Sequence, residues 1–172
     1  VLPNGNTAGD PIIKHAQFGS DDGMAFVLPY EKGTKWLFAS SKGYGFTALG
    51  EGMTTRNKKG KDLINLDGGK IMPPVDMTDS DYVAVLTKQG KMLVFKADEV
   101  KVLPKGKGVK LVGLGEDDHV AGVCSLNQGE SIYVMMRGRK PHRIKANEWF
   151  EDFVLPRSRK GRYVAVRKAD LI

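Results

Sequence analysis

The chain repeats one hairpin pattern three times, and this repeat limits the possible folds more than any other feature. Apolar runs that end in a turn with glycine recur at 36–43 (WLFASSKG), 82–90 (YVAVLTKQG) and 131–138 (SIYVMMRG). A second short strand-like run follows each turn: YGFTAL, KMLVF and RKPHRI. Two such runs joined by a tight glycine turn are typical of a β-hairpin. The closing glycines, Gly43, Gly90 and Gly138, lie 47 and 48 residues apart.

A second set of glycines supports the same period. Each hairpin is followed by a basic loop, a glycine and another apolar run, at 56–66 (RNKKGKDLINL), 104–114 (PKGKGVKLVGL) and 157–166 (RSRKGRYVAV). The aligned glycines are Gly60, Gly108 and Gly161, and the longer last interval contains the extra segment KANEWFEDFVLP. A further apolar segment precedes each hairpin: MAFVLP, IMPPVDM and HVAGVCSL.

Four short strands in roughly 40–50 residues are typical of one blade in a propeller-like array. We therefore predict an all-β fold with blades at 24–66, 71–114 and 119–168, and a tail of a preceding blade plus a loop at 1–23. An ordinary antiparallel sandwich is the alternative. Trp36 and Trp149 are expected to pack between blades rather than to stack on bases.

Charge and cysteine content narrow the function classes. Lysine and arginine total 27 against 20 aspartates and glutamates, giving a net charge of +7, and this balance favours a polyanionic partner. The single cysteine, Cys124, excludes an internal disulfide and fits a reducing cytoplasm. No apolar run approaches the ~18 residues that cross a membrane, so no membrane partner is expected.

The basic side chains recur in register, whereas many acidic residues fall in the connections between units. If equivalent loops occupy equivalent places in the array, the cations form a band, which is the electrostatic footprint of nucleic-acid binding. With no recognition helix and no zinc-ligand spacing, such contacts would fix position and bend rather than read sequence. The candidate DNA contacts are Arg56, Lys58, Lys59, Lys61, Lys105, Lys107, Lys110, Arg137, Arg139, Lys140, Arg157, Arg159, Lys160 and Arg162.

Several segments resemble a known family, the C-terminal β-pinwheel domains of bacterial type IIA topoisomerase A subunits. The resemblance is carried by LFASSKGYGF (37–46), RNKKGKDLINL (56–66), IMPPV (71–75), TKQGKMLVF (87–95) and KGKGVKLVGL (105–114), and more loosely by GRKPHRIKANEW and RSRKGR. It favours the topoisomerase IV branch, because the gyrase branch carries a glutamine-, arginine- and glycine-rich box. The segment PKGKG at 104–108 is only a degenerate version of that box.

The resemblance implies a partial or open β-pinwheel of three to four blades, which is a fragment of a C-terminal DNA-binding domain. It implies non-sequence-specific duplex binding and bending, and presentation of DNA to a catalytic core elsewhere in the A subunit. The parent enzyme would use ATP and Mg²⁺ and an ATPase B subunit, in a heterotetramer, to decatenate DNA and relax supercoils at the bacterial nucleoid in the cytoplasm. The alternatives are a propeller-like protein-interaction module and the wrapping domain of the gyrase A subunit.

No catalytic centre, metal site or cofactor is expected in this chain itself. His15, His119 and His142 share no metal-ligand spacing with each other or with Cys124. The glycine-rich run KGKGVK lacks the glycine spacing and following helix of a nucleotide-binding loop. The catalytic tyrosine of the family belongs to the core, and none of the chain's tyrosines is assigned that role.

Overall fold

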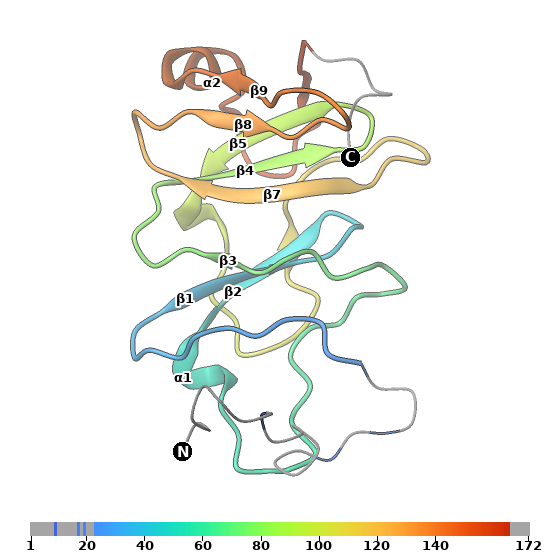
Figure 1. The fold of residues 1–172 in the computed structure, drawn as a ribbon, viewed down its shortest axis with the longest axis vertical. Coiled ribbons are helices and arrows are strands. Elements are labelled where there is room, and N and C mark those ends of the chain that lie inside the picture. The colour runs from blue at the N-terminus through green and yellow to red at the C-terminus, as the bar shows by residue number, and fades with distance from the viewer. Residues whose placement is uncertain (1–8, 10–16, 18, 20–22, 166–172) are drawn as a thin grey trace.

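The computed structural model describes residues 9, 17, 19 and 23–165, in which β-sheets follow one another along the long axis of the molecule (Figure 1). The all-β prediction is confirmed. The strands are β1 (Lys35–Ala39), β2 (Tyr44–Leu49), β3 (Val75–Asp76), β4 (Tyr82–Thr87), β5 (Lys91–Lys96), β6 (Val109–Lys110), β7 (Val120–Leu126), β8 (Ile132–Val134), β9 (His142–Ile144) and β10 (Arg162–Tyr163). The helical elements are α1 (Gly50–Met53), the 3-10 turn η2 (Ala97–Glu99) and α2 (Ala146–Asp152).

All three predicted hairpins form: β1–β2, β4–β5 and β8–β9. Gly43 and Gly90 close their turns at φ 78°, a left-handed conformation that glycine adopts without steric cost. The third turn is offset by one residue. Counted from the paired residues Phe38↔Phe46, Val85↔Leu93 and Val134↔His142, Arg139 rather than Gly138 occupies the position of Gly43 and Gly90.

The sheets exchange strands between neighbouring units. One four-stranded sheet has the order β3-β1-β2-β6 and the other β10-β5-β4-β7. Each sheet therefore takes its central hairpin from one unit and both outer strands from the next unit. The sequence predicts that the four strands of one unit form one blade, and this is wrong. The outer strands complete the hairpin before them, which ties consecutive units together through backbone hydrogen bonds.

The predicted boundaries 24–66, 71–114 and 119–168 remain a prediction about the repeat. Within the described residues the segment 24–29 pairs with no strand, contrary to expectation, and 62–66 contributes only an isolated bridge at Ile64. Most of the predicted tail at 1–23, and residues 166–168, lie outside the described residues.

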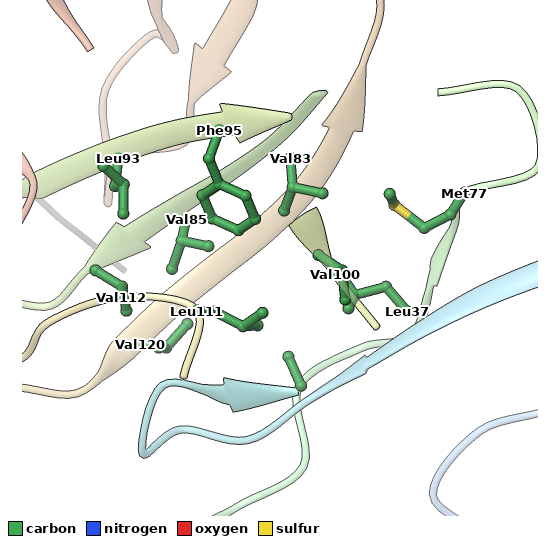
Figure 2. Close-up of a cluster of buried hydrophobic side chains, with 11 residues drawn as sticks. Leu37, Met77, Val83, Val85, Leu93, Phe95, Val100, Leu111, Val112 and Val120 are labelled. Carbon is green, nitrogen blue, oxygen red and sulfur yellow. The ribbon is translucent and has the colours of Figure 1, made fainter. Parts of the chain in front are cut away.

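The main core lies between the two four-stranded sheets. Leu37 from the first sheet packs with Val83, Val85 and Phe95 from the second, and Leu111 closes the cluster; all five side chains are fully buried. Figure 2 shows these side chains filling the space between the ribbons. Burial of several branched and aromatic side chains, at about 1.5–3 kcal/mol each, is what holds neighbouring units together.

A second core joins the second sheet to the third hairpin. Trp149 of α2 is fully buried there, and its Nε1 donates a hydrogen bond to the Glu130 carbonyl at 2.7 Å. The extra segment of the last repeat interval thus forms α2, and its tryptophan packs as predicted. In the described part of the chain, no helix is long and apolar enough to cross a membrane.

Candidate nucleic-acid interface

The three basic loops are joined to one another by backbone hydrogen bonds. Asn65, just after the first loop, donates its N–H to the carbonyl of Gly106 in the second loop at 2.9 Å. Gly113, just after the second loop, donates to the carbonyl of Arg159 in the third at 2.8 Å. The loops that the sequence pattern aligned are therefore consecutive neighbours in space, and each carries a lysine immediately before its aligned glycine: Lys59, Lys107 and Lys160.

The first loop projects its predicted cations into solvent. Arg56, Lys58, Lys59 and Lys61 are all exposed. Asn57 shapes the loop, because its carbonyl accepts the Gly60 N–H at 2.9 Å and its side-chain oxygen accepts the Lys59 N–H at 3.0 Å. The Lys61 ammonium donates to the Gly52 carbonyl. The turn that Asn57 stabilises thus presents the other three cations, Arg56, Lys58 and Lys59, to solvent.

The second loop holds one of its lysines in a small charged cluster. The Lys107 ammonium lies 2.7 Å from an Asp67 carboxylate oxygen and 4.1 Å from the centre of the Tyr44 ring, so both a carboxylate and an aromatic face stabilise its charge. The hydrogen bond and charge of Lys107 lower the pKa of Asp67, and the same hydrogen bond raises the pKa of Lys107. Lys105 and Lys110 are exposed.

A hollow of about 740 Å³ between the second and third loops gathers three predicted cations, Lys110, Arg159 and Lys160. The hollow is also lined by Gly113, Leu114, Leu155, Pro156 and Ser158. Here the structure brings candidate residues of two different loops onto one surface. A phosphate at its rim would meet three positive side chains and no carboxylate among the lining residues.

Arg157 is bonded to other parts of the protein. Its guanidinium donates to the Lys110 carbonyl, and its backbone N–H donates to a carboxylate oxygen of Glu99 at 2.9 Å. These bonds fasten the third loop to β6 and to η2, and Arg157 is not among the residues that line the hollow. Its contact with DNA stays a prediction. Arg162 is exposed on β10.

The remaining candidates, Arg137, Arg139 and Lys140, are exposed in the β8–β9 turn. That turn belongs to a different element from the three loops and does not line the hollow between the second and third loops. Their part in a continuous band stays a prediction.

Three aspartates share a second hollow, which none of the predicted cations lines. Asp79, Asp81 and Asp98 line a separate hollow of about 510 Å³, at the end of the second sheet where β4 begins and β5 ends. Asp118 is buried, and its carboxylate accepts the backbone N–H groups of Gln89 and His119 at 3.0 and 2.9 Å. Among the described residues, no group of three histidine, cysteine, aspartate or glutamate side chains could hold a metal ion.

Sequence reasoning missed Asp67 and Tyr44 as partners of Lys107. Asp67 is 40 residues and Tyr44 is 63 residues from Lys107 in the chain. A local sequence pattern does not predict contacts over such separations. The aligned glycine of the second loop has a structural role. A Cβ on Gly108 would lie 2.0 Å from the Gly45 carbonyl oxygen, so this glycine is needed for the approach of β6 to β2.

Replacing Asp67 with asparagine should release Lys107 and strengthen duplex binding. One additional phosphate contact is worth up to about 0.9 log unit of affinity at 0.1 M salt and steepens the log–log salt slope by up to about 0.9. Fluorescence anisotropy with a labelled duplex measures both quantities. Asp98→Asn, in the acidic hollow, is the matched control; an equal gain from both variants would show that net charge alone matters.

The Asp67–Lys107 pair also gives a pH dependence of defined sign. Because the folded-state pKa of Asp67 is below its ordinary value of 3.8, the pair contributes stability above that value and loses it as the pH falls through the lowered pKa. The effect on stability is small because both side chains reach solvent.

Comparison with known proteins was made on sequence and on structure. The family model for the DNA gyrase C-terminal domain, beta-propeller, matches residues 81–123. The A subunit of DNA topoisomerase 4 from Pseudomonas aeruginosa is 30% identical over 169 residues, covering 93% of this chain and 22% of that protein. The same subunit from Escherichia coli K12 is 32% identical over 137 residues, covering 78% of this chain and 18% of that protein. The chain thus spans about a fifth of the length of these curated relatives.

Solved structures agree with the sequence relatives. The C-terminal domain of E. coli ParC superposes with a TM-score of 0.85 at 26% identity, covering 98% of this chain and 71% of that one. The C-terminal domain of DNA gyrase A superposes with a TM-score of 0.70 at 17% identity, covering 94% of this chain and 55% of that one. The predicted β-pinwheel fold class is confirmed.

Proposed function

The chain belongs to the family of C-terminal β-pinwheel domains found in the A subunits of topoisomerase 4 and gyrase, and on this basis we propose that its basic loops bind the backbone of duplex DNA. The observation that carries the proposal is the hollow between the second and third loops, where Lys110, Arg159 and Lys160 meet. Cations from consecutive repeats on one surface match a polyanion with regularly spaced charges.

Binding of this kind is non-sequence-specific, because phosphate contacts position a duplex without reading its bases. Contact with several consecutive loops would bend the duplex along the array. Bending 20–30 base pairs costs on the order of 1–6 kcal/mol, which contacts from more than one loop must offset. The first loop supplies Arg56, Lys58 and Lys59 for this purpose, and Lys107 joins them when Asp67 releases it.

In the parent protein, the domain would present DNA segments to a catalytic core elsewhere in the A subunit. ATP-dependent strand passage for decatenation and supercoil relaxation would take place there, with Mg²⁺ and an ATPase B subunit, at the nucleoid in the bacterial cytoplasm. These steps belong to the whole enzyme, and this chain contributes the surface that captures and bends the duplex.

The test is a titration of duplexes of increasing length over a range of salt concentrations. A backbone-binding array should gain affinity with length until the loops are filled. Its log–log salt slope should correspond to about 0.9 per neutralised phosphate. Base sequence should change the affinity little. Affinity that is independent of duplex length and insensitive to salt would contradict the proposal and favour a protein-interaction module.

A further inference from the structure

In the second loop, a single residue makes both backbone hydrogen bonds to the segment that follows the first loop. Gly106 donates its N–H to the Leu63 carbonyl, and its own carbonyl accepts the Asn65 N–H; both bonds are 2.9 Å long. Leu63 and Asn65 lie three and five residues after the aligned glycine Gly60. This contact gives the reference for the same place one unit later.

The third loop divides the equivalent contact between two residues. Ser158 donates its N–H to the Leu111 carbonyl at 2.9 Å, and the Arg159 carbonyl accepts the Gly113 N–H at 2.8 Å. Leu111 and Gly113 lie three and five residues after the next aligned glycine, Gly108. Two residues thus stand opposite the position that one residue serves in the second loop, and this is the arrangement of a β-bulge.

Ser158 is the inserted residue of this bulge. Arg159 precedes Gly161 by two residues, as Gly106 precedes Gly108, so Ser158 has no counterpart in the second loop. Its φ is 71°, a left-handed conformation that a residue with a Cβ adopts at a steric cost. Bulges often redirect a side chain beside a binding site, and the side chain of Ser158 lines the hollow between the second and third loops.

Backbone contacts hold the bulge on both sides. The Arg159 N–H donates to the Pro156 carbonyl at 3.4 Å and closes a turn whose third residue is Ser158. A Cβ on Gly113 would lie 3.0 Å from the Ser158 carbonyl oxygen, so the turn packs directly on the segment after the second loop. Ser158 is exposed, and within the described residues its hydroxyl has no hydrogen-bond partner. A fixed backbone therefore presents this hydroxyl to a ligand in the hollow.

The three cations of the hollow are also available to a ligand. Lys110, Arg159 and Lys160 are exposed, and in the part of the chain that the structure describes none of them forms an ion pair. A phosphodiester group carries one negative charge and several acceptor oxygens. Cations can neutralise the charge while a serine hydroxyl donates to one oxygen, which is a common form of backbone contact.

The junction between the first and second loops does not reproduce this site. Counted from the aligned glycines, Asp62 stands in the place of Lys110. Lys107 stands in the place of Lys160, and its ammonium lies 2.7 Å from a carboxylate oxygen of Asp67. The bulge is missing there as well, because one residue makes both bonds. A phosphate would therefore be held more strongly at the second junction than at the first.

We propose that the hollow is a pocket for one backbone phosphate of the duplex, and that the Ser158 hydroxyl is its uncharged donor. The inference rests on the proposed DNA binding and adds a fixed point to it, at which the duplex is anchored between the second and third loops. Both walls of the pocket belong to the two four-stranded sheets: Lys110 is part of β6, and the third loop leads into β10.

The variant Ser158→Ala removes the donor and keeps a Cβ in the left-handed turn. Duplex affinity should fall about tenfold, the value of one hydrogen bond to a charged group. The log–log salt slope should stay unchanged, because a neutral donor displaces no counterion. Loss of a cation, by contrast, lowers the affinity and flattens the slope together. Fluorescence anisotropy with a labelled duplex at several salt concentrations measures both quantities.

Two further variants separate the hydroxyl from the shape of the turn. Ser158→Gly also lacks the hydroxyl but relaxes the left-handed conformation, so it should lose as much affinity as Ser158→Ala while its urea midpoint rises. Ser158→Asn keeps a donor in a residue that tolerates this conformation, and it should bind like the parent chain. Ser80→Ala, in the hollow lined by three aspartates, is the matched control and should leave the affinity unchanged.

A titration with inorganic phosphate, without DNA, examines the pocket independently of the duplex. In heteronuclear NMR spectra, the amide signals of Ser158, Arg159 and Gly113 should shift saturably with phosphate and not with chloride at the same ionic strength. The shifts should be weaker in Ser158→Ala. If the signals shift but Ser158→Ala binds duplex like the parent chain, the pocket serves a free phosphate and the assignment to DNA is wrong.

Other outcomes would overturn the inference in different ways. A parent chain that binds duplex, with amide signals that do not respond to phosphate and an unchanged affinity in Ser158→Ala, would remove the pocket and leave the proposed function standing. Full affinity in Ser158→Gly with a loss in Ser158→Ala would show that turn shape matters and the hydroxyl does not. A parent chain that does not bind duplex would overturn the proposed function and the inference together.

Discussion

Replacing Gly108 with alanine is expected to lower the free energy of unfolding by more than about 3 kcal/mol, a large share of the 5–15 kcal/mol typical of a domain. Gly108 has φ 83°, a left-handed conformation that costs a residue with a Cβ about 1–2 kcal/mol. The new Cβ would also lie 2.0 Å from the Gly45 carbonyl oxygen and 2.3 Å from its carbon. Both atoms are backbone, so β6 must leave β2, and the pairing of Tyr44 with Lys110 is lost.

Two other aligned glycines separate the causes of this effect. In Gly161→Ala, the Cβ would lie 2.4 Å from the Met92 carbonyl oxygen, whereas the position has no left-handed φ. Gly60 has φ 76° but no atom within 4 Å of an added Cβ, so Gly60→Ala should cost only about 1–2 kcal/mol. Urea unfolding followed by tryptophan fluorescence measures all three. Equal losses for Gly60→Ala and Gly108→Ala would contradict the role of close strand approach.

The sequence allowed the hairpins to be located because their signals are local. Gly43 and Gly90 each close a tight turn between two apolar runs, and the pairing partners lie within a dozen or so residues. The aligned glycines Gly108 and Gly161 proved equivalent in structure as well, since each sits where an outer strand meets the preceding hairpin. An added Cβ would clash with backbone atoms at both positions, so both require glycine, and the glycines can be recognised in the sequence.

The strand exchange could not be predicted by the same means. β3 and β6 are two residues long, and pairing within one unit or with the neighbouring unit uses the same alternation of apolar residues. Only the three-dimensional path of the chain determines whether a strand pairs within its own unit or with the neighbouring unit. The one-residue offset at Gly138 could not be predicted either. Gly138 lies between Arg137 and Arg139, and the local sequence is compatible with either register of the turn.

The candidate interface was predicted as a set of residues but not as a geometry. Loop cations could be aligned by their glycines, whereas the inward role of Arg157 depends on the Lys110 carbonyl 47 residues away. That Lys110, Arg159 and Lys160 line one hollow likewise depends on how the third loop folds back on β6. Charge pattern identifies candidates, and long-range backbone contacts decide which of them share a surface.

Removing the three cations of the hollow should cause the largest loss of DNA affinity. The variant Lys110→Gln, Arg159→Gln and Lys160→Gln deletes three phosphate contacts without introducing repulsion. Each lost contact costs about 0.9 log unit at 0.1 M salt, so duplex affinity should fall about 500-fold and the log–log salt slope should flatten by about 2.7. The loss should be uniform across duplex sequences, because these residues meet phosphates rather than bases. Anisotropy titrations at several salt concentrations measure the affinity and the slope together.

A control with the same net charge distinguishes contact from attraction at a distance. Lys35→Gln, Lys96→Gln and Lys145→Gln together also remove three positive charges, but from positions outside the basic loops. A protein attracted to DNA only by its total charge would lose affinity equally in both triple variants, and that result would rule out the hollow as a contact site. If the hollow holds phosphates, the control should retain most of the affinity and nearly the full salt slope. The intermediate variant Arg56→Gln, Lys58→Gln and Lys59→Gln then shows how far along the array the duplex extends, because its effect depends on whether the bent DNA reaches the first loop.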